Sequence, residues 1–301
     1  MQPIFRRYIG CVTSGFISAA LLVGPAIGAD KASPAPDFSG MWGRTTFDHE
    51  ALPLGPGPMT NIIRLPTGTS DPTRPAGNYR NPILTPRAAE IVRRRAEEAV
   101  GGKPFFDPSS QCAPFTPVYS FAMQLGLQML QSKNEITILY TQDEQIRRVR
   151  LNARHPAHVV ASWMGDSVGH YEGDALVIDT IGIKTGPLAM VDRYGTPYSE
   201  ALHVVERYRL IDGKTANQAA ERHEKEAGRL GAAMDIDSNF GTGLQLTFTI
   251  EDANMFTVPW SAHITYRHNR GEWQELVCAE NNVDVTGKLL PDIPVAQKAD
   301  F

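Results

Sequence analysis

The segment from Trp163 to Thr180 constrains the local fold of this chain more than any other part of the sequence. Glu172-Gly173-Asp174 separates two runs rich in strand-forming residues, a pattern typical of a β-hairpin with a two-residue Gly-Asp turn. That turn sets the register, with the expected pairs Tyr171–Leu176, His170–Val177 and Val168–Asp179. His170 and Asp179 then become diagonal neighbours on one face of the sheet.

Segments with a period of two continue from residue 118 to the C-terminal region. They cover residues 118–132, 135–141, 145–151, 167–171, 175–183, 201–211, 244–251, 258–268 and 272–278. Tight turns separate most of them, and no alternation of strands with helices appears. The pattern predicts a mostly β fold, with an antiparallel β-barrel preferred over a sandwich.

Two segments are expected to be helical and to lie outside the barrel. Thr85 and Pro86 are typical of a helix start, and the predicted helix covers residues 87–100 before Gly101-Gly102. The second, within residues 215–234, belongs to an insert at about 215–243 between two strands. The Pro- and Gly-rich residues 52–82 predict an irregular segment that lies over the surface, where it can cover a barrel mouth.

The first 29 residues have the features of a secretory signal peptide. Arg6 and Arg7 precede an apolar run that includes 17–23, and small residues end at Ala29. The run is too short to anchor the protein in a bilayer. We therefore expect a periplasmic or secreted protein without stable membrane insertion, and a single domain over residues 30–301.

Two cysteines, Cys112 and Cys278, remain after the expected cleavage. In an oxidising compartment such a pair is expected to form a disulfide. The alternative is two separate buried thiols. A bridge would tie the middle of the chain to its C-terminal region.

The charge balance limits the classes of partner. Loss of the two signal arginines leaves 27 basic against 33 acidic residues, a net charge of −6. No basic stretch interleaved with aromatic residues remains, so nucleic acid is not an expected partner. The sequence does not define the oligomeric state.

Strand alternation places Glu206 on the more apolar face of residues 201–210, with Arg207 on the other face. A carboxylate that points inward has a raised pKa unless a cation compensates, which makes Glu206 a candidate acid or base. The alternative is an interior Glu paired with an Arg that fixes the strand register.

Aromatic residues offer a second group of candidates. Trp260 and Tyr266 share one face of residues 258–268, where they either line a pocket or belong to the core. Trp163 precedes the hairpin and is a further candidate for substrate contact. A Tyr266 hydroxyl in a pocket would donate a hydrogen bond to a substrate oxygen.

Motifs for metals and for nucleophilic catalysis are weak. His155 and His158 flank a proline turn without a third ligand, so no metal site and no cofactor are expected. Residues 165–169 match Gly-x-Ser-x-Gly around Ser167, but a hairpin follows where the hydrolase fold requires a helix. We interpret this match as a coincidence.

Several motifs resemble those of a large family of exported bacterial β-rich proteins of unassigned function. They are Trp163–Thr180, Ser199–Arg209, Phe256–Trp260 and Cys278–Asn282, in that order. Gly40-Met41-Trp42 also resembles the Gly-x-Trp entry of lipocalin-like barrels. The resemblance implies a lipocalin-like barrel, and such barrels include both carriers and cofactor-free enzymes.

The leading functional hypothesis is cofactor-independent acid/base chemistry on a small, partly apolar organic molecule inside the barrel. The reaction would be a lyase, isomerase or hydratase step, in which His170 and Asp179 or Glu206 move the proton. Arg207 or Tyr266 would stabilise developing negative charge, and Trp163 and Trp260 would contact the substrate. The alternative is a non-catalytic periplasmic carrier or sensor for a small ligand.

Overall fold

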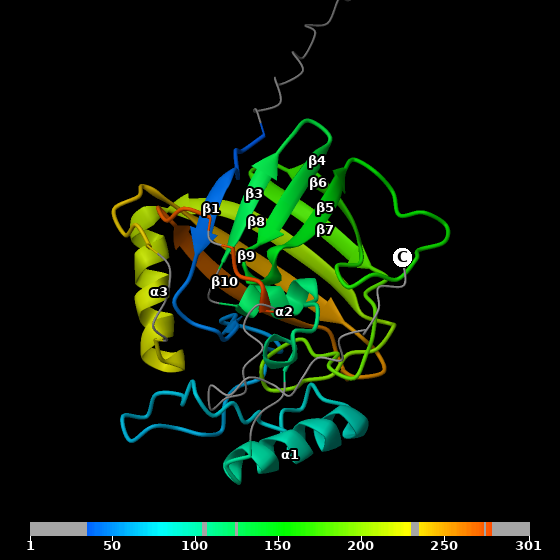
Figure 1. Ribbon diagram of the computed structural model, residues 1–301, viewed down its shortest axis with the longest axis vertical. Helices are drawn as coiled ribbons and strands as arrows, with labels where there is room; N and C mark the ends of the chain where they lie inside the picture. Colours follow the sequence, from blue (N-terminus) through cyan, green and yellow to red (C-terminus); the bar gives the residue numbers. More distant parts are fainter. Residues whose placement is uncertain (1–34, 104–106, 124–125, 230–234, 274, 279–301) are drawn as a thin grey trace, which may run out of the picture. The chain divides into compact units, whose positions relative to one another are not determined.

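Nine strands close into a β-barrel in the computed structural model of this chain (Figure 1). The structure describes residues 35–103, 107–123, 126–229, 235–273 and 275–278. Going round the barrel, the strands are β1 (Gly40–Gly43), β3 (Leu127–Gln131), β4 (Glu135–Tyr140), β5 (Gln145–Leu151), β6 (Asp166–Glu172), β7 (Ala175–Ile181), β8 (His203–Asp212), β9 (Thr242–Glu251) and β10 (Trp260–His268). Pairing of Trp42 in β1 with His268 in β10 closes the ring. A two-residue strand, β2 (Glu50–Ala51), also pairs with β10.

The sheet is mixed, so the expectation of a fully antiparallel barrel was wrong at one position. Strands β5 and β6 run parallel, with Val149 opposite Ser167 and Leu151 opposite Gly169. A parallel pair needs a connection of about a dozen residues or more. Residues 152–165 supply it, because they carry the chain back along the barrel before β6 begins.

The predicted hairpin register is confirmed. Strands β6 and β7 pair Tyr171 with Leu176, His170 with Val177 and Val168 with Asp179. Gly173 has a φ of +60°, a backbone angle that glycine adopts without the steric cost that other residues incur. The turn sequence therefore determines which residues of this hairpin face the core.

The ends of the predicted strand series required correction. Residues 118–132 were expected to form one strand, but the chain first forms helix α2 (Pro117–Ala122) and then β3. Thr116 caps α2 by accepting a hydrogen bond from the Tyr119 amide, and Pro117 fits the first helical turn. Of residues 272–278, the described ones form no strand. The short strands β1 and β2 were not predicted.

Two longer helices lie where the sequence indicated. Helix α1 (Pro86–Val100) begins at the predicted cap, since Thr85 accepts a hydrogen bond from the Ala88 amide. Helix α3 (Gly213–Ala227) ends before residue 234, the predicted end. It packs along β9 and β10 (Figure 1) and buries His223. No helix among the described residues has the length and apolarity needed to cross a membrane.

Side chains fill the barrel interior. Alternate residues of β7 to β10 point inward and are buried in one hydrophobic core, including Ile178, Tyr208, Phe248, Trp260 and Tyr266. The irregular segment 52–82 forms only isolated bridges, as its composition indicated. Its residue Ala76 packs against Ala96 and Ala99 of α1. The described residues form one compact unit, and the expected signal peptide lies outside them.

The predicted disulfide is confirmed. The sulfur atoms of Cys112 and Cys278 lie 2.10 Å apart across a separation of 166 residues. The backbone amide of Cys278 also donates to the Asp143 carboxylate at 2.7 Å. The disulfide ties the chain after β10 to the segment that precedes α2, and the hydrogen bond ties it to the turn between β4 and β5.

Replacing Cys112 and Cys278 together by serine is expected to lower the free energy of unfolding by several kcal/mol. A loop of this length restricts the unfolded chain by about 5 kcal/mol in the chain-entropy model. Urea unfolding of the double variant, compared with the oxidised and the reduced wild type, measures the loss. Equal stability of the double variant and the oxidised protein would show that the bridge does not stabilise the fold.

Candidate functional site

The polar residues singled out from sequence lie on both sides of the barrel wall and do not meet in one place. Glu206 points into the barrel and is fully buried. His170, Asp179 and Arg207 lie on the outer face, where they pair with other polar side chains. The hypothesis that His170 and Asp179 or Glu206 act together therefore has no shared cavity to support it.

Glu206 is held by an interior arginine. Arg147, on β5, donates two hydrogen bonds to the Glu206 carboxylate at 2.8 and 2.5 Å, and both side chains are almost completely buried. The Tyr208 hydroxyl donates to the same carboxylate at 3.0 Å. The remaining guanidinium donors of Arg147 reach the Ser167 and Thr180 hydroxyls. This arrangement is the structural alternative considered for Glu206, and it also uses the Ser167 hydroxyl.

On the outer face, imidazoles and carboxylates alternate across several strands. The two carboxylate oxygens of Asp179 contact two different imidazoles. Oδ1 lies 2.9 Å from His155 Nε2, and Oδ2 lies 3.0 Å from His203 Nε2. The other ring nitrogen of His155 lies 2.6 Å from Asp166. These contacts fasten residues 152–165 to the barrel, and they give Asp179 a role in holding that connection.

His170 and Arg207 both contact one exposed carboxylate. The His170 Nε2 lies 2.9 Å from Glu172, and Arg207 Nη1 lies 2.8 Å from the other oxygen of the same residue. All three side chains are at least one-third exposed. This cluster borders solvent and not a pocket.

The three aromatic candidates have packing roles. Trp260 and Tyr266 are buried in the barrel core, and the Tyr266 hydroxyl donates to the Phe121 carbonyl at 3.1 Å. Trp163 stacks under the Lys184 ammonium, 5.3 Å from the ring centroid. The Trp260 ring lies 6.3 Å from that of His49, which lines the pocket described next.

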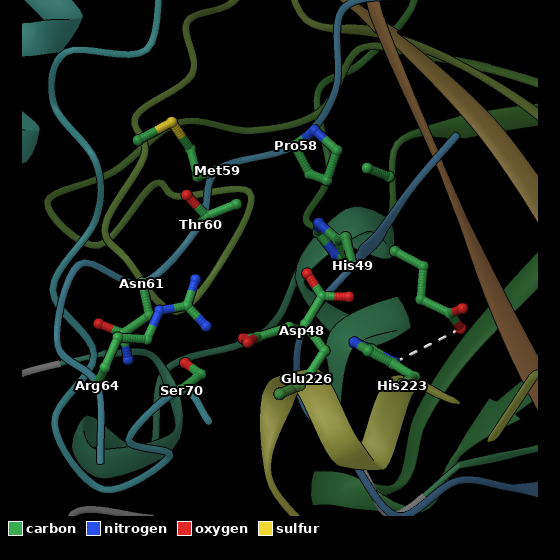
Figure 2. A pocket seen from close by; sticks show the side chains of 13 residues that line it. Asp48, His49, Pro58, Met59, Thr60, Asn61, Arg64, Ser70, His223 and Glu226 are labelled. Carbon is green, nitrogen blue, oxygen red and sulfur yellow. Dashed lines mark ion pairs between the residues drawn. The ribbon is translucent and has the colours of Figure 1, made fainter. Parts of the chain in front are cut away.

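A small pocket lies between three segments that the sequence does not place together (Figure 2). It is lined by Asp48, His49 and Glu50 at the start of β2, by His223 and Glu226 of α3, and by Met59, Asn61, Arg64 and Ser70 of the irregular segment. Figure 2 shows His49, Asp48 and His223 along one wall, with Asn61, Arg64 and Ser70 opposite. Its volume is about 50 Å³. We call it the mouth pocket.

Three polar atoms of the mouth pocket are buried without a hydrogen-bond partner among the described residues. They are Asp48 Oδ1, His49 Nε2 and Ser70 Oγ. More than nine in ten buried polar groups normally have a partner, which can be protein, water or a ligand. Three such atoms in residues that line one small space leave polar groups that water or a polar ligand can satisfy.

His49 is neutral because of its surroundings. Burial, together with the nearby Arg44 charge, lowers the pKa of His49 to about 3. Its ring packs edge-on against Phe248 at 5.0 Å. A neutral imidazole has one donor and one acceptor nitrogen, so Nε2 is available to bind a substrate group in either role.

His223 is also neutral and is fixed by polar contacts. Its Nδ1 lies 3.1 Å from the Thr46 hydroxyl, 3.3 Å from Arg44 and 3.4 Å from Glu50. Burial, and then the Arg44 charge, lowers the pKa of His223 to about 3. Nδ1 is occupied by these contacts, and His223 is one of the residues that line the mouth pocket.

The pKa values of the two carboxylates in residues 48–50 are shifted in opposite directions. Burial raises the pKa of Asp48, although Arg193 and the Tyr194 hydroxyl partly compensate. Burial acts the same way on Glu50, but a hydrogen bond from His263 at 3.2 Å and the neighbouring charges outweigh it, and the pKa of Glu50 is lowered. Burial therefore favours the protonated form of Asp48 more than in water, while Glu50 stays ionised at neutral pH.

Sequence reasoning missed every residue of this site. His223 lies in the helical insert that was expected outside the barrel, and Asp48 and His49 lie between β1 and β2, the two strands that were not predicted, with Glu50 as the first residue of β2. The available signal was the acid-His-acid tripeptide just before a proline-rich segment. Among the described residues, no group of three or more His, Cys, Asp or Glu side chains is arranged to hold a metal ion.

Changing Glu206 to Gln is expected to lower the free energy of unfolding by about 3–5 kcal/mol, because the buried Arg147 charge loses its carboxylate. The double variant Arg147→Met/Glu206→Leu should lose less, since no uncompensated charge remains. Urea unfolding of single and double variants tests this. A double variant as unstable as Glu206→Gln would contradict the argument.

The two neutral histidines predict a loss of stability in acid. In the unfolded chain an imidazole binds its proton at about pH 6.5, but in the folded protein only near pH 3. Between these values the unfolded state binds more protons, so the free energy of unfolding falls as the pH falls. Asp192, whose pKa burial raises to about 6, acts in the opposite direction.

His223→Gln removes one of these sites and leaves Asp192 unchanged. Its stability should therefore depend less steeply on pH between about 3 and 6.5 than that of the wild type. Chemical unfolding at a series of pH values gives both curves. Parallel curves would mean that His223 does not lose its proton on folding.

The chain was also compared with known proteins. No protein-family model, no curated protein and no solved structure matches it. Neither a family nor an activity can therefore be transferred by similarity, and the functional argument depends on the mouth pocket.

Proposed function

We propose that the chain is an acid/base enzyme whose active site is the mouth pocket and not the barrel interior. The reaction class is a lyase, isomerase or hydratase step on a small organic molecule. The observation that carries this proposal is that Asp48, His49 and Ser70 line one small pocket, and that Asp48 Oδ1, His49 Nε2 and Ser70 Oγ are buried and unpartnered among the described residues.

The pKa directions assign the roles. Proton transfer is most efficient when the pKa of the acid or base lies near the working pH. Asp48, whose pKa is raised by burial, meets this condition better than the two histidines, whose pKa values of about 3 make them weak bases. Asp48 is thus the proton-transfer residue.

His49 and His223 act as neutral hydrogen-bonding groups. An imidazole with a strongly lowered pKa can donate its N–H to a substrate oxygen without carrying a charge of its own. Negative charge that develops on such an oxygen is stabilised by these donors, which are held in a buried environment. Arg44 and the Thr46 hydroxyl can donate to His223 Nδ1 and so position the ring with its N–H on Nε2.

The dimensions of the pocket limit the substrate. A volume of about 50 Å³ is far below the 300–1,000 Å³ of pockets for drug-sized ligands. Met59, Pro58 and Ala227 provide an apolar part of the lining. The substrate, or the part of it that reacts, is therefore small and partly apolar.

The cellular setting is part of the same proposal. A disulfide between Cys112 and Cys278 supports an oxidising compartment, and hence an exported, periplasmic or secreted protein. The closed barrel with peripheral helices supports a lipocalin-like fold and the resemblance to exported bacterial β-rich proteins. Lipocalin-like ligand binding inside the barrel has less support, because core side chains occupy that space.

A non-catalytic carrier or sensor is the second candidate. The specific observation in its favour is the Arg147–Glu206 pair, which satisfies the carboxylate that sequence placed in the reaction. In this case the mouth pocket binds a small molecule and releases it unchanged.

Native mass spectrometry of the mature protein from its own host, followed by exchange in heavy water, tests the proposal. A molecule released on denaturation identifies the ligand. The enzyme should then catalyse deuterium exchange or conversion of that ligand, and Asp48→Asn should slow the reaction about 100-fold or more. Proton NMR of the ligand measures both processes.

Asp174→Asn is the matched control. Asp174 is an exposed residue of the hairpin turn, paired only loosely with Arg209 at 3.3 Å, so its loss should leave the rate unchanged. Binding without exchange or conversion would favour the carrier. Equal rates for Asp48→Asn and the wild type would remove Asp48 from the mechanism.

A further inference from the structure

A second concave site, separate from the mouth pocket, lies along helix α1. It is a groove of about 410 Å³ between α1, the segment 185–200 and Met255. Its size falls in the range of small-molecule sites. We call it the α1 groove, and the residues used below are Arg87, Ile91, Arg95, Pro187, Tyr198 and Met255.

One stripe of α1 faces the groove. Arg87, Ile91 and Arg95 are spaced four residues apart and so lie on the same side of the helix. They present two guanidinium groups with an apolar side chain between them. The eight-residue step from Arg87 to Arg95 spans about 12 Å along the helix axis. At this separation the two arginines do not both bind the same carboxylate.

The arginines of α1 differ in their partners. Arg93 and Arg94, on the solvent side, form ion pairs with Glu90, and Arg93 also pairs with Glu97. Within the described part of the chain, neither groove arginine forms an ion pair with a carboxylate; the polar contact found for Arg95 is with the Met190 sulfur at 3.7 Å. The groove therefore carries two guanidinium groups that have no direct ion pair with a carboxylate among the described residues.

The side chain of Arg95 packs closely against the backbone of Gly195. The backbone of Gly195 has a φ of +74°, and a Cβ at that residue would lie 2.3 Å from the Arg95 side chain. The arginine is half-buried, and burial lowers its pKa despite the nearby charges of Asp192 and Glu98. A partly desolvated guanidinium without a bound carboxylate gains most from an incoming anion.

Arg87 supports the same interpretation. It lies in the first turn of α1, where no acidic residue is present and where the helix dipole disfavours a cation. Glu200 is the acidic residue of the lining, which leaves the groove with a net charge of +1. Ile91, Pro187 and Met255 provide an apolar surface between and beside the charges.

We infer that the α1 groove binds a small organic anion, a carboxylate or phosphate attached to an apolar body, with Arg95 as the main anchor. The apolar body lies against Ile91 and Met255, and Arg87 contributes long-range attraction. The Tyr198 hydroxyl is already used, since it donates to the Lys184 carbonyl at 2.7 Å. This inference does not depend on the reaction proposed for the mouth pocket.

Titration with four probes of similar shape tests the inference. Benzoate and phenyl phosphate carry the two candidate anionic groups, whereas benzyl alcohol is neutral and benzylamine is a cation. Chemical shifts of α1 groove residues in the folded protein report binding and give dissociation constants. At least one anion should bind at millimolar concentration, and the alcohol and the amine should bind at least about tenfold more weakly.

Substitutions on one helix provide the controls. Arg95→Gln should weaken anion binding about tenfold or more, Arg95→Lys should weaken it less, and Arg94→Gln should leave it unchanged. Thermal melting shows whether each variant is folded, and Arg87→Gln replaces Arg95→Gln as the test if the latter unfolds. The inference is overturned if no anion binds, if benzyl alcohol binds equally well, or if Arg94→Gln weakens binding as much as Arg95→Gln.

Discussion

The buried ion pair between Arg147 and Glu206 determines how the barrel can be used. Through its guanidinium, Arg147 contacts side chains of three neighbouring strands, so one residue links β5 to β6, β7 and β8. It spans the single parallel junction of the sheet, where the ladder between β5 and β6 is short. An interior held in this way is a packed core, which is why the proposed ligand site lies at its margin.

The mouth pocket lies at the edge of this core. It combines titratable groups whose environments shift their pKa values in different directions. The same burial that keeps two imidazoles neutral holds the pKa of Asp48 above its usual range, while His263 keeps Glu50 ionised. Acid, carboxylate and neutral donors thus coexist within one small space. Such separation is common at active sites, because it supplies an acid and a base at the same pH.

Local patterns predicted the local structure well, and the functional site poorly. The hairpin of β6 and β7, the start of α1 and most strand positions follow from turn chemistry, capping and alternation, all of which act over a few residues. The parallel pair of β5 and β6 was missed because it depends on the long connection between them. Helix α2 was missed because it begins at a single Thr-Pro cap within a segment that alternates like a strand. The mouth pocket joins His49 to His223 and Ser70, and no short-range pattern specifies which distant segments will meet.

Closure of the barrel has a consequence for the order of folding. Strand β1 comes early in the chain, yet one of its two neighbours is β10. The barrel is therefore closed only when Trp42 pairs with His268, near the other end of the sheet-forming sequence. Contacts of such sequence separation form slowly, because a long loop must be ordered first. His263, which holds Glu50, belongs to the same late strand. A chain that stops before β10 therefore lacks both the closed barrel and the His263–Glu50 contact beside the mouth pocket, so the barrel and this pocket are completed by the same strand.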